Sequence, residues 1–337
     1  MPDNRNTKTT LEDLARLAGV SISTVSRALN DQPLISMTTK QRIWSLARDH
    51  NYPFRSSMPT APIGAEGSIA IVTPHMQGRA LPLSHPFFLE LLASIGEAAR
   101  ARGCDFMVSH VAPASFEDLV ITTSTSRASG VIFLGQSMLH EAFNELAATN
   151  ARFVVWGAHM PGQKYRSIGS DNTLGGRRAT LHLCRLGRKA VVFLGGNDPE
   201  SLQRRQGYLN ALQDSGLEAD PKLIIPVEFE LESAEEAVTR LLRRGVRFDG
   251  IFASSDLIAL GAIRALRRAG VSVPGDVSVV GYDDMLLSRL STPALSTIRQ
   301  DTARAGQLLV ASILEPGGDS SPGYLPTELI VRESCGG

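Results

Sequence analysis

The segment SISTVSRALN, residues 21–30, combines short hydroxyl side chains with one guanidinium group at Arg27. Serine, threonine and valine are only middling helix formers, so a helix built solely to fill a core would rarely contain so many of them. Hydroxyl groups and helix N-terminal N–H groups bind phosphate oxygens, and a guanidinium group matches O6 and N7 of guanine. This segment is therefore suited to DNA binding, with a small protein-binding module as the alternative.

Three charged side chains follow apolar runs in the second part of the chain. They are Asp171 in GSDNTLGG, Arg204 in QRRQGY and Asp256 in SSDLIALG. Each carboxylate either caps a helix or accepts hydrogen bonds from ligand hydroxyl groups, and the arginine is either solvated, ion-paired or a ligand contact. Two roles are likewise open for three aromatic residues, which either pack in the core or stack against a ligand: Phe87, Phe88 and Trp156.

Local sequence patterns predict three helices in and around the hydroxyl-rich segment. Thr10 precedes LEDLARLAG with Asp13 three residues later, a capping-box pattern, and Gly19 ends this first helix. Ser21 is a suitable N-cap for the second helix and Ser36 for a third. Helix, glycine-containing turn and helix together predict a helix-turn-helix. The apolar stripe of the second helix is Val25, Ala28 and Leu29.

A sheet would position the charged residues Asp171, Arg204 and Asp256, and the sequence predicts its strands. Short apolar runs predict strands over residues 68–73, 104–109, 130–135, 152–156, 190–196, 222–227, 250–254 and 277–283. Amphipathic segments between them predict helices over residues 87–103, 172–187, 201–216 and 257–270. This alternation indicates parallel α/β sheets covered on both faces. Ligands of such folds bind beyond the carboxyl ends of the strands.

Composition excludes several classes of protein. The 337 residues are 43% hydrophobic and 20% charged, as in ordinary globular proteins, and no apolar run is long enough for a membrane helix. The three cysteines are widely spaced, which argues against a disulfide framework. His182 and Cys184 are better explained as helix residues than as metal ligands, so we expect no metal and no cofactor. We expect a cytoplasmic protein, because the polar N-terminus lacks a signal-peptide core.

Charge is unevenly distributed along the chain. Residues 1–60 contain eight Lys and Arg residues against five Asp and Glu residues, although the whole chain has a net charge of zero. A modestly basic head on a slightly acidic body permits nucleic-acid contact by the head.

The run LARLAGVSISTVSRALN resembles the DNA-binding head of the LacI/GalR family of transcriptional regulators. The resemblance implies that Ile22, Ser23 and Arg27 face base edges. It further implies contacts with the DNA backbone from Ser21, Thr24, Ser26 and Asn30.

The linker, residues 54–67, departs from the family pattern. The family has a hinge helix here, whose leucine wedges into the minor groove. In this chain Ala61 stands in place of that leucine, and Pro59 would interrupt the helix. The sequence favours an extended tether. The alternative is a short helix over residues 55–58 with Met58 as the wedge.

The rest of the chain is also similar to the family, through SDNTLGG, RRQGY, SSDLIALGAIRALRRAG, VSVVGYDD and TPALSTIRQD. The implied fold is a helix-turn-helix head, residues 1–53, and a periplasmic-binding-protein-like core, residues 68–337. The core would consist of two doubly wound α/β subdomains joined by three chain crossings. Their expected limits are residues 68–165 with 299–322, and residues 166–298 with 323–335. The implied effector contacts in the cleft between them are Phe87, Phe88, Asp171, Arg204 and Asp256.

These observations predict a ligand-controlled regulator that represses carbohydrate-use genes. VVWGAH resembles family members that respond to glucosides, and Trp156 offers a flat face to a pyranose ring. The expected partners are pseudo-palindromic operator DNA, a small sugar and a second copy of the chain, with no membrane. The alternatives are a regulator of the same fold that responds to a purine or another small metabolite, and a sugar-binding protein without a DNA role. An enzyme is disfavoured, because the chain has no P-loop, no GxGxxG motif after the first strand and no nucleophile elbow.

Overall fold

The computed structural model describes residues 9–29, 32, 35–50, 52, 68–73, 75–76, 79–80, 84–109, 112–126, 128–315 and 323–336. The chain divides into two units, Met1–Ala65 and Glu66–Gly337. We call the first unit the head and the second the body.

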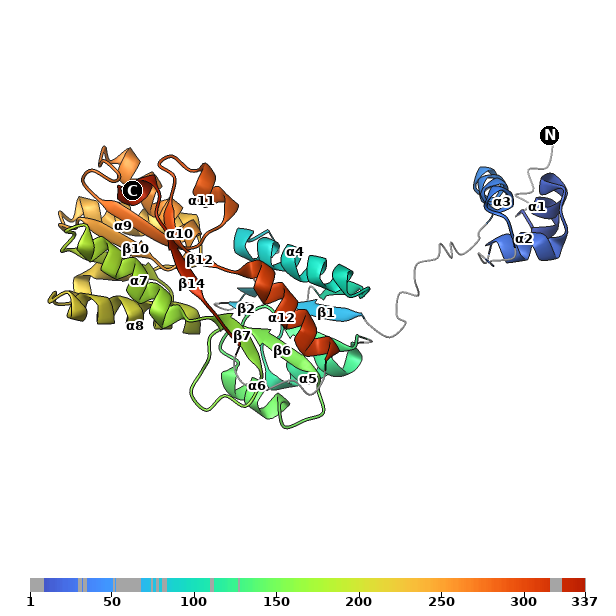
Figure 1. Cartoon of the computed structure of the whole chain (residues 1–337), viewed down its shortest axis with the longest axis horizontal. Coiled ribbons are helices and arrows are strands. Elements are labelled where there is room, and N and C mark those ends of the chain that lie inside the picture. Colours follow the sequence, from blue (N-terminus) through green and yellow to red (C-terminus); the bar gives the residue numbers. More distant parts are fainter. Residues whose placement is uncertain are drawn as a thin grey trace, which may run out of the picture. The chain divides into compact units, whose positions relative to one another are not determined.

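The head consists of three helices, α1 (Leu11–Ala18), α2 (Ile22–Leu29) and α3 (Met37–Asp49) (Figure 1). Thr10 and Asp13 form the expected capping box at the start of α1, and Gly19 ends this helix in the left-handed conformation with φ of 62°. The Oγ atoms of Ser21 and Ser36 accept the N–H groups of Thr24 and Thr39, at 3.1 and 3.3 Å. The three predicted helices and their caps are confirmed.

A small apolar core holds these helices together. Its fully buried members come from all three helices and are Leu14, Val25, Ala28, Ile43 and Ala47. Because the buried side of α2 consists of its predicted apolar stripe, the other side of that helix remains in solvent.

The body contains two six-stranded sheets. The first has the order β13-β7-β6-β5-β1-β4, and all of its neighbouring strands are parallel. Its strands are β1 (Ile69–Val72), β4 (Phe106–Ser109), β5 (Gly130–Phe133), β6 (Phe153–Trp156), β7 (Ser167–Ser170) and β13 (Gly323–Leu325). A hairpin of β2 (His75–Met76) and β3 (Arg79–Ala80) follows β1.

Helices cover both faces of the first sheet. Ile69 and Ile71 pack with α4 (Pro86–Ala101) and α12 (Thr302–Leu314), which lie side by side (Figure 1). Ala70 and Val72 point to the opposite face, toward α5 (Phe116–Thr125) and α6 (His140–Leu146). Alternate residues of one strand thus enter two cores, which explains why β1 is apolar throughout.

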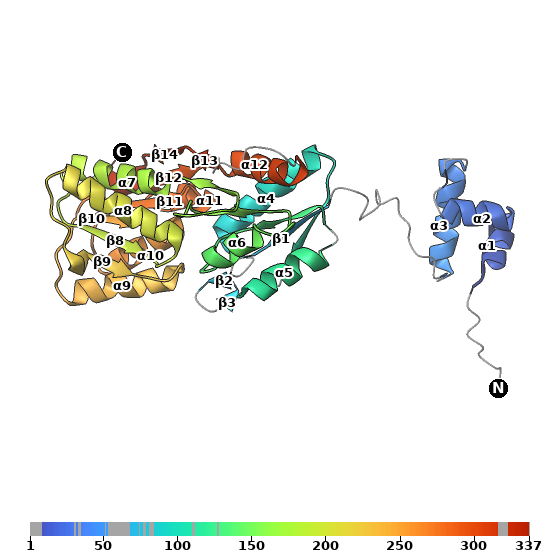
Figure 2. The ribbon, with the colours of Figure 1, turned by 90° about the horizontal axis from the view of Figure 1, so that it is seen from below.

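The second sheet has the order β14-β12-β11-β10-β8-β9, and its edge strand β14 runs antiparallel to β12. Its strands are β8 (Val191–Gly195), β9 (Ile224–Pro226), β10 (Gly250–Ala253), β11 (Ser278–Asp283), β12 (Ser296–Gln300) and β14 (Thr327–Ile330). Its face helices are α7 (Asn172–Arg185), α8 (Pro199–Asp214), α9 (Leu231–Arg243) and α10 (Asp256–Arg268). Figure 2 shows α8 and α9 on opposite sides of β8 and β10.

Three short helices complete the body. They are α11 (Leu286–Leu290) and the 3-10 helices Pro221–Leu223 and Glu333–Cys335. Among the helices of the described residues, none combines the length and apolar character that crossing a bilayer demands.

The chain crosses between the two sheets three times, after β7, after β12 and after β13. These positions differ from the subdomain limits expected from sequence. β7 and β13 pair within the first sheet, and all of β12 belongs to the second. The expected limits fell before β7, within β12 and before β13, whereas the chain crosses after the carboxyl end of each of these strands. The limits of the subdomains therefore shift by a few residues.

Candidate functional site

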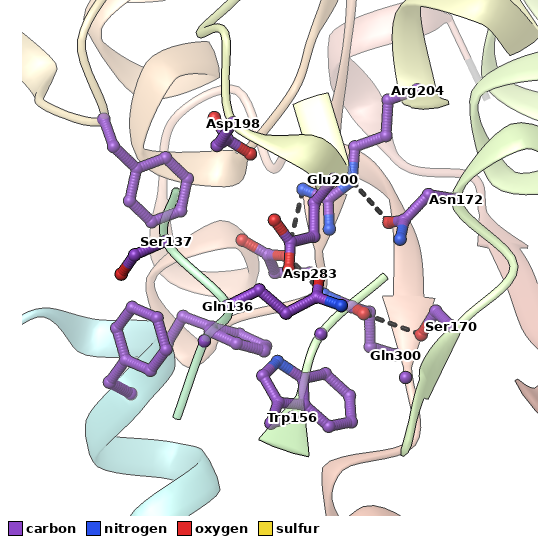
Figure 3. Close-up of a pocket in the computed structure, with 16 residues that line it drawn as sticks. Gln136, Ser137, Trp156, Ser170, Asn172, Asp198, Glu200, Arg204, Asp283 and Gln300 are labelled. Carbon is purple, nitrogen blue, oxygen red and sulfur yellow. Dashed lines mark hydrogen bonds and ion pairs between the residues drawn. The ribbon is translucent and has the colours of Figure 1, made fainter. Parts of the chain in front are cut away.

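A pocket lies between the two sheets of the body, where loops from the carboxyl ends of strands in both sheets converge. It encloses about 640 Å³ of space including its open mouth, which is in the usual range for small-molecule sites. Among the described residues, its lining consists of Phe87, Phe88, Gly135, Gln136, Ser137, Trp156, Gly157, Gly169, Ser170, Asn172, Asp198, Glu200, Arg204, Phe229, Asp283 and Gln300. Figure 3 shows the polar side chains converging above Trp156.

Four aromatic side chains form the apolar part of the lining. Phe87 lies 5.4 Å from Phe88 and 6.0 Å from Trp156, measured between ring centroids. On the other subdomain, Phe229 stacks against His85 at 4.4 Å. Flat apolar faces of this kind suit the C–H faces of a ring-shaped ligand. The structure thus brings the three predicted aromatic residues to the pocket.

Arg204 of α8 lines the pocket as expected from sequence, but it is 5% exposed rather than solvated. Its Nε donates to Asn172 Oδ1 at 2.9 Å, and its Nη1 donates to the carbonyl of Ser254. The guanidinium group lies 3.7 Å above the centre of the Tyr282 ring. Its Nη1 is 3.9 Å from Asp283 Oδ1. This network fixes the arginine in the wall of the pocket.

Asp283 and Gln300 line the pocket although sequence reasoning did not select them. Asp283 Oδ1 accepts a hydrogen bond from Gln300 Nε2 at 2.7 Å, and Gln300 Oε1 accepts one from Ser170 Oγ at 2.6 Å. Burial raises the pKa of Asp283 well above its ordinary value. Its backbone φ is 119°, a strained conformation for a residue with a side chain.

Asp256 does not line the pocket, which corrects the ligand role expected for it. Its carboxylate is fully buried and accepts hydrogen bonds from the Met285 N–H and from the hydroxyl groups of Ser288 and Thr297. Burial raises its pKa to about 7. Because internal donors already occupy both oxygens, the side chain joins the loops behind the pocket instead of facing it.

Asp171 lies outside the lining, between two residues that belong to it, and its expected ligand role stays a prediction. Its Oδ1 caps α7 by accepting the Leu174 N–H at 2.8 Å. Its neighbours Ser170 and Asn172 line the pocket in its place. The helix-cap interpretation of Asp171 therefore accounts for its structural position.

Three further pocket residues were missed from sequence. Asp198 caps α8 through the Ser201 N–H at 2.9 Å. Glu200 Oε1 accepts the Ala158 N–H at 3.2 Å, a contact between the two subdomains. Burial, with the nearby Asp198 charge as a smaller cause, raises the pKa of Glu200 to about 7. Gln136 is fully buried in the loop after β5.

A sequence pattern for the missed residues does exist. Gln136 and Asp198 lie in LGQS and GGNDPE, just beyond the ends of β5 and β8, and Asp283, in GYDD, is the last residue of β11. Polar groups at the carboxyl ends of parallel strands are candidates for ligand contacts. Applying this rule to every strand, rather than only to helix starts, would have selected them.

The head presents a second candidate site on α2. Ile22 is 46% exposed and Arg27 is also exposed, whereas Ser26 is partly buried. The Ser21 hydroxyl lies 2.8 Å from the hydroxyl groups of both Ser23 and Thr24. These side chains form a compact polar start to the helix. The predicted contacts Asn30 and Met58, and the linker between residues 53 and 67, lie outside the described residues.

The weak metal pattern around His182 has another explanation. His182 Nε2 lies 3.1 Å from Cys335 Sγ, and Ser296 Oγ lies 2.9 Å from the same sulfur. Among the residues that the structure describes, no three His, Cys, Asp or Glu side chains are grouped as metal ligands. These contacts attach the C-terminal 3-10 helix to α7 and β12.

Comparison with known proteins matches both units. Residues 10–53 match the model for bacterial regulatory proteins of the lacI family, and residues 180–335 match a periplasmic binding protein-like domain. The HTH-type transcriptional regulator MalR of Clostridium butyricum is 30% identical, with 96% of this chain and 98% of that protein covered.

Two solved structures resemble the whole chain. A complex of the transcriptional regulator CelR with cellobiose has a TM-score of 0.69 and 28% identity, covering 97% of this chain and 100% of that one. A lac repressor dimer bound to operator and the anti-inducer ONPF has a TM-score of 0.70 and 26% identity, covering 98% and 99%.

Proposed function

The chain belongs to the LacI family of bacterial transcriptional regulators, and from that premise we propose that it is a repressor of carbohydrate-use genes controlled by a sugar. The main supporting observation is the pocket, whose polar and aromatic lining comes from both sheets of a body attached to a helix-turn-helix head. A ligand held by both subdomains can stabilise one arrangement of them over another. A DNA-binding role places its action in the cytoplasm.

In this proposal α2 enters the major groove of the operator. Ile22, Ser23 and Arg27 read base edges, with Arg27 suited to guanine. Backbone phosphates are contacted by Ser21, Thr24, Ser26 and Asn30, and Met58 is a candidate minor-groove wedge. The exposure of Ile22 and Arg27 supports this assignment, because a large apolar side chain left in solvent, on a helix that also exposes an arginine, favours an intermolecular contact.

The sugar would control DNA binding through contacts that join the subdomains around the pocket. These contacts include three hydrogen bonds. Glu200 accepts one from the Ala158 N–H, Gln203 Nε2 donates one to the His159 carbonyl at 2.7 Å, and Ser170 donates one to Gln300. A sugar would stack on Phe87, Phe88 and Trp156 and form hydrogen bonds with Arg204 and Asp283. It would thereby change how strongly the two subdomains are held together. Coupling of about 1–3 kcal/mol between sugar and operator is the usual size of such an effect.

A homodimer would present two heads to a pseudo-palindromic operator. An exposed apolar edge supports this assembly. Strand β4 ends the first sheet, and its Phe106, Met107 and Val108 are 41%, 44% and 37% exposed. On the other subdomain, Leu286 and Leu290 of α11 are 59% and 71% exposed. An edge strand with an exposed apolar surface is normally covered by another chain or segment.

Operator binding measured with and without sugars tests the proposal. Fluorescence anisotropy with a fluorescent fragment of the upstream region of the protein's own gene should detect specific binding. At least one of the sugars cellobiose, maltose and glucose should shift the midpoint of the operator-binding curve. A midpoint that responds to hypoxanthine or guanine and to no sugar would instead support a purine-responsive regulator. Binding that is equal on unrelated DNA would contradict the regulator assignment itself.

A further inference from the structure

An imidazole ring and a phenyl ring join the two subdomains beside the pocket. His85 is the N-cap residue of α4, which packs on the first sheet, and Phe229 lies in the loop before α9 of the second subdomain. The two rings are stacked, with centroids 4.4 Å apart and planes 12° apart. Phe88, also from the first subdomain, meets His85 edge-on at 5.5 Å. Separating the subdomains would therefore remove the stack and expose one face of His85 to water.

The surroundings of His85 favour its neutral form. The residue is only 7% exposed, and neither ring nitrogen has a hydrogen-bond partner in the part of the chain that the structure describes. The side chain does not cap α4 either. An imidazolium carries two N–H donors and a charge, and burying these without partners is far more costly than burying a neutral ring. Burial accordingly lowers the pKa of His85 to about 4.

The charged groups around the stack do not offset this cost. They come from α4, from the loop before α9 and from the start of α8, and they are Glu90, Asp198, Glu200, Arg204, Glu228 and Glu230. None of these side chains is bonded to a ring nitrogen of His85. The Phe229 face attracts a cation weakly, but it cannot replace the hydrogen bonds that both N–H groups make in water.

The proton and the stack therefore compete for His85. In an open arrangement, with the subdomains apart, the imidazole is solvated and its pKa returns toward 6.5. The closed arrangement, in which the rings stack, binds the proton less tightly. Its stability relative to the open arrangement therefore falls as pH drops below that value. Between pH 7.5 and 5.5, His85 alone should lower the closed-to-open ratio about tenfold.

Glu200 titrates in the opposite sense. Burial raises its pKa to about 7 while it accepts the Ala158 N–H of the other subdomain. The arrangement with this contact binds the proton more tightly, so Glu200 favours closure as pH falls. The pH dependence of the wild type is the sum of both effects. A variant that keeps a ring at position 85 but cannot titrate isolates the contribution of His85.

We propose that the stack of His85 on Phe229 is a pH-sensitive contact: the neutral imidazole holds the two subdomains together, and its protonation separates the rings. This device goes beyond the proposed function, because it acts without an effector and His85 is not among the residues that line the pocket.

Nuclear magnetic resonance of the full-length chain, labelled with carbon-13 in its histidine rings, tests the competition. The His85 signal, identified by its loss in His85→Phe, should remain that of a neutral ring at pH 5.5. In Phe229→Ala it should become mostly protonated at this pH, because the ring gains access to water. Phe248→Ala removes a partly buried ring of the second subdomain outside the pocket lining and should match the wild type. A protonated His85 in the wild type, a neutral one in Phe229→Ala, or equal changes in both variants would overturn the proposal.

Hydrogen exchange at the Ala158 N–H tests the separation of the subdomains. Ala158 is fully buried in the first subdomain and donates to Glu200 of the second, so protection of its N–H reports the closed arrangement. His85→Phe retains a ring for stacking. On lowering the pH from 7.5 to 5.5, protection relative to the unstructured rate should fall about tenfold further in the wild type than in His85→Phe. Equal changes in the two proteins would overturn the proposal. Circular dichroism checks that every variant is folded.

Discussion

The exposed side of α2 and the pocket of the body differ in how their polar groups are partnered. At the start of α2 the Ser21 hydroxyl is the hydrogen-bond partner of the hydroxyl groups of both Ser23 and Thr24, so these contacts lie within one turn of helix. In the pocket, Arg204 and Asp283 are buried and depend on partners from distant parts of the chain. Replacing a residue on α2 should therefore change binding with little change in stability. Replacing one in the pocket wall should change both.

Arg204→Ala is expected to have the largest effect on stability of the variants that test this contrast. The change removes a buried cation beside Asp283 and leaves Asn172 Oδ1 and the Ser254 carbonyl without their donor. Removing one partner of a buried charged network costs about 3–5 kcal/mol. We expect a loss of that size in the free energy of unfolding of the body, measured by urea denaturation. A loss below about 1 kcal/mol would show that water or a neighbour replaces the guanidinium group, and the contrast would weaken.

Asp256→Asn gives the next largest expected effect, because both oxygens of this buried carboxylate accept hydrogen bonds. Three donors reach Asp256, and an amide can accept on one side only, so unpaired donors should cost about 1–3 kcal/mol.

The pH dependence of stability gives Asp256 a second signature. Its pKa is raised in the folded chain from 3.8 to about 7, chiefly by burial. The folded state therefore binds the proton more tightly than the unfolded state, so this group's contribution to stability falls as pH rises across that interval. Urea denaturation between pH 4 and 7.5 should show a flatter profile for Asp256→Asn than for the wild type. Glu218→Gln, which removes an exposed carboxylate of the body, should keep the wild-type profile. A wild-type slope in Asp256→Asn would contradict the assignment.

Arg27→Ala is the counterpart on the head. Losing a guanidinium group that reads a base should cost about 1–3 kcal/mol of operator binding and relax specificity at one base pair. Because Arg27 is exposed and lies outside the core of the head, the unfolding midpoint should stay the same. Arg243→Ala, which removes an exposed arginine from the body, is the matched control for charge. Equal losses of operator affinity in the two variants would mean that Arg27 acts only through net charge.

The same contrast explains which parts of the molecule were predictable from sequence. The head was predictable because its caps, apolar stripe and glycine turn are local patterns, such as Thr10 with Asp13. The apolar strands and their order along the chain were predictable for a similar reason. The strands β7 and β12 were missed because their sequences, SIGS and STIRQ, carry small and polar side chains instead of an apolar run.

The pocket was only partly predictable, since its members are brought together by tertiary structure. Phe87, Phe88, Trp156 and Arg204 were placed correctly at its lining. Sequence reasoning selected Asp256 at a helix start, and the structure instead turns its carboxylate inward toward the α11 region. Which of two strand-end carboxylates faces a cleft depends on the path of the loops, and no local pattern encodes that path.

Ser21 offers the smallest expected effect and the finest test of the contrast, because it has two separable roles on α2. As N-cap, its hydroxyl accepts the Thr24 N–H at 3.1 Å, and replacement by alanine should cost about 1 kcal/mol of helix stability. Hydrogen exchange of the α2 amides in the full-length chain should accelerate accordingly in Ser21→Ala.

Ser21→Asp then distinguishes the cap from the proposed phosphate contact. Aspartate is also a good N-cap, so hydrogen exchange in α2 should stay near the wild-type rate. Its negative charge would repel a phosphate, so operator affinity should fall further than in Ser21→Ala, and the difference should shrink as salt is raised. If operator affinity follows the hydrogen-exchange rates in both variants, Ser21 serves DNA binding only by stabilising the helix. If affinity and exchange separate, the exposed face carries a binding role that is independent of its contribution to the fold.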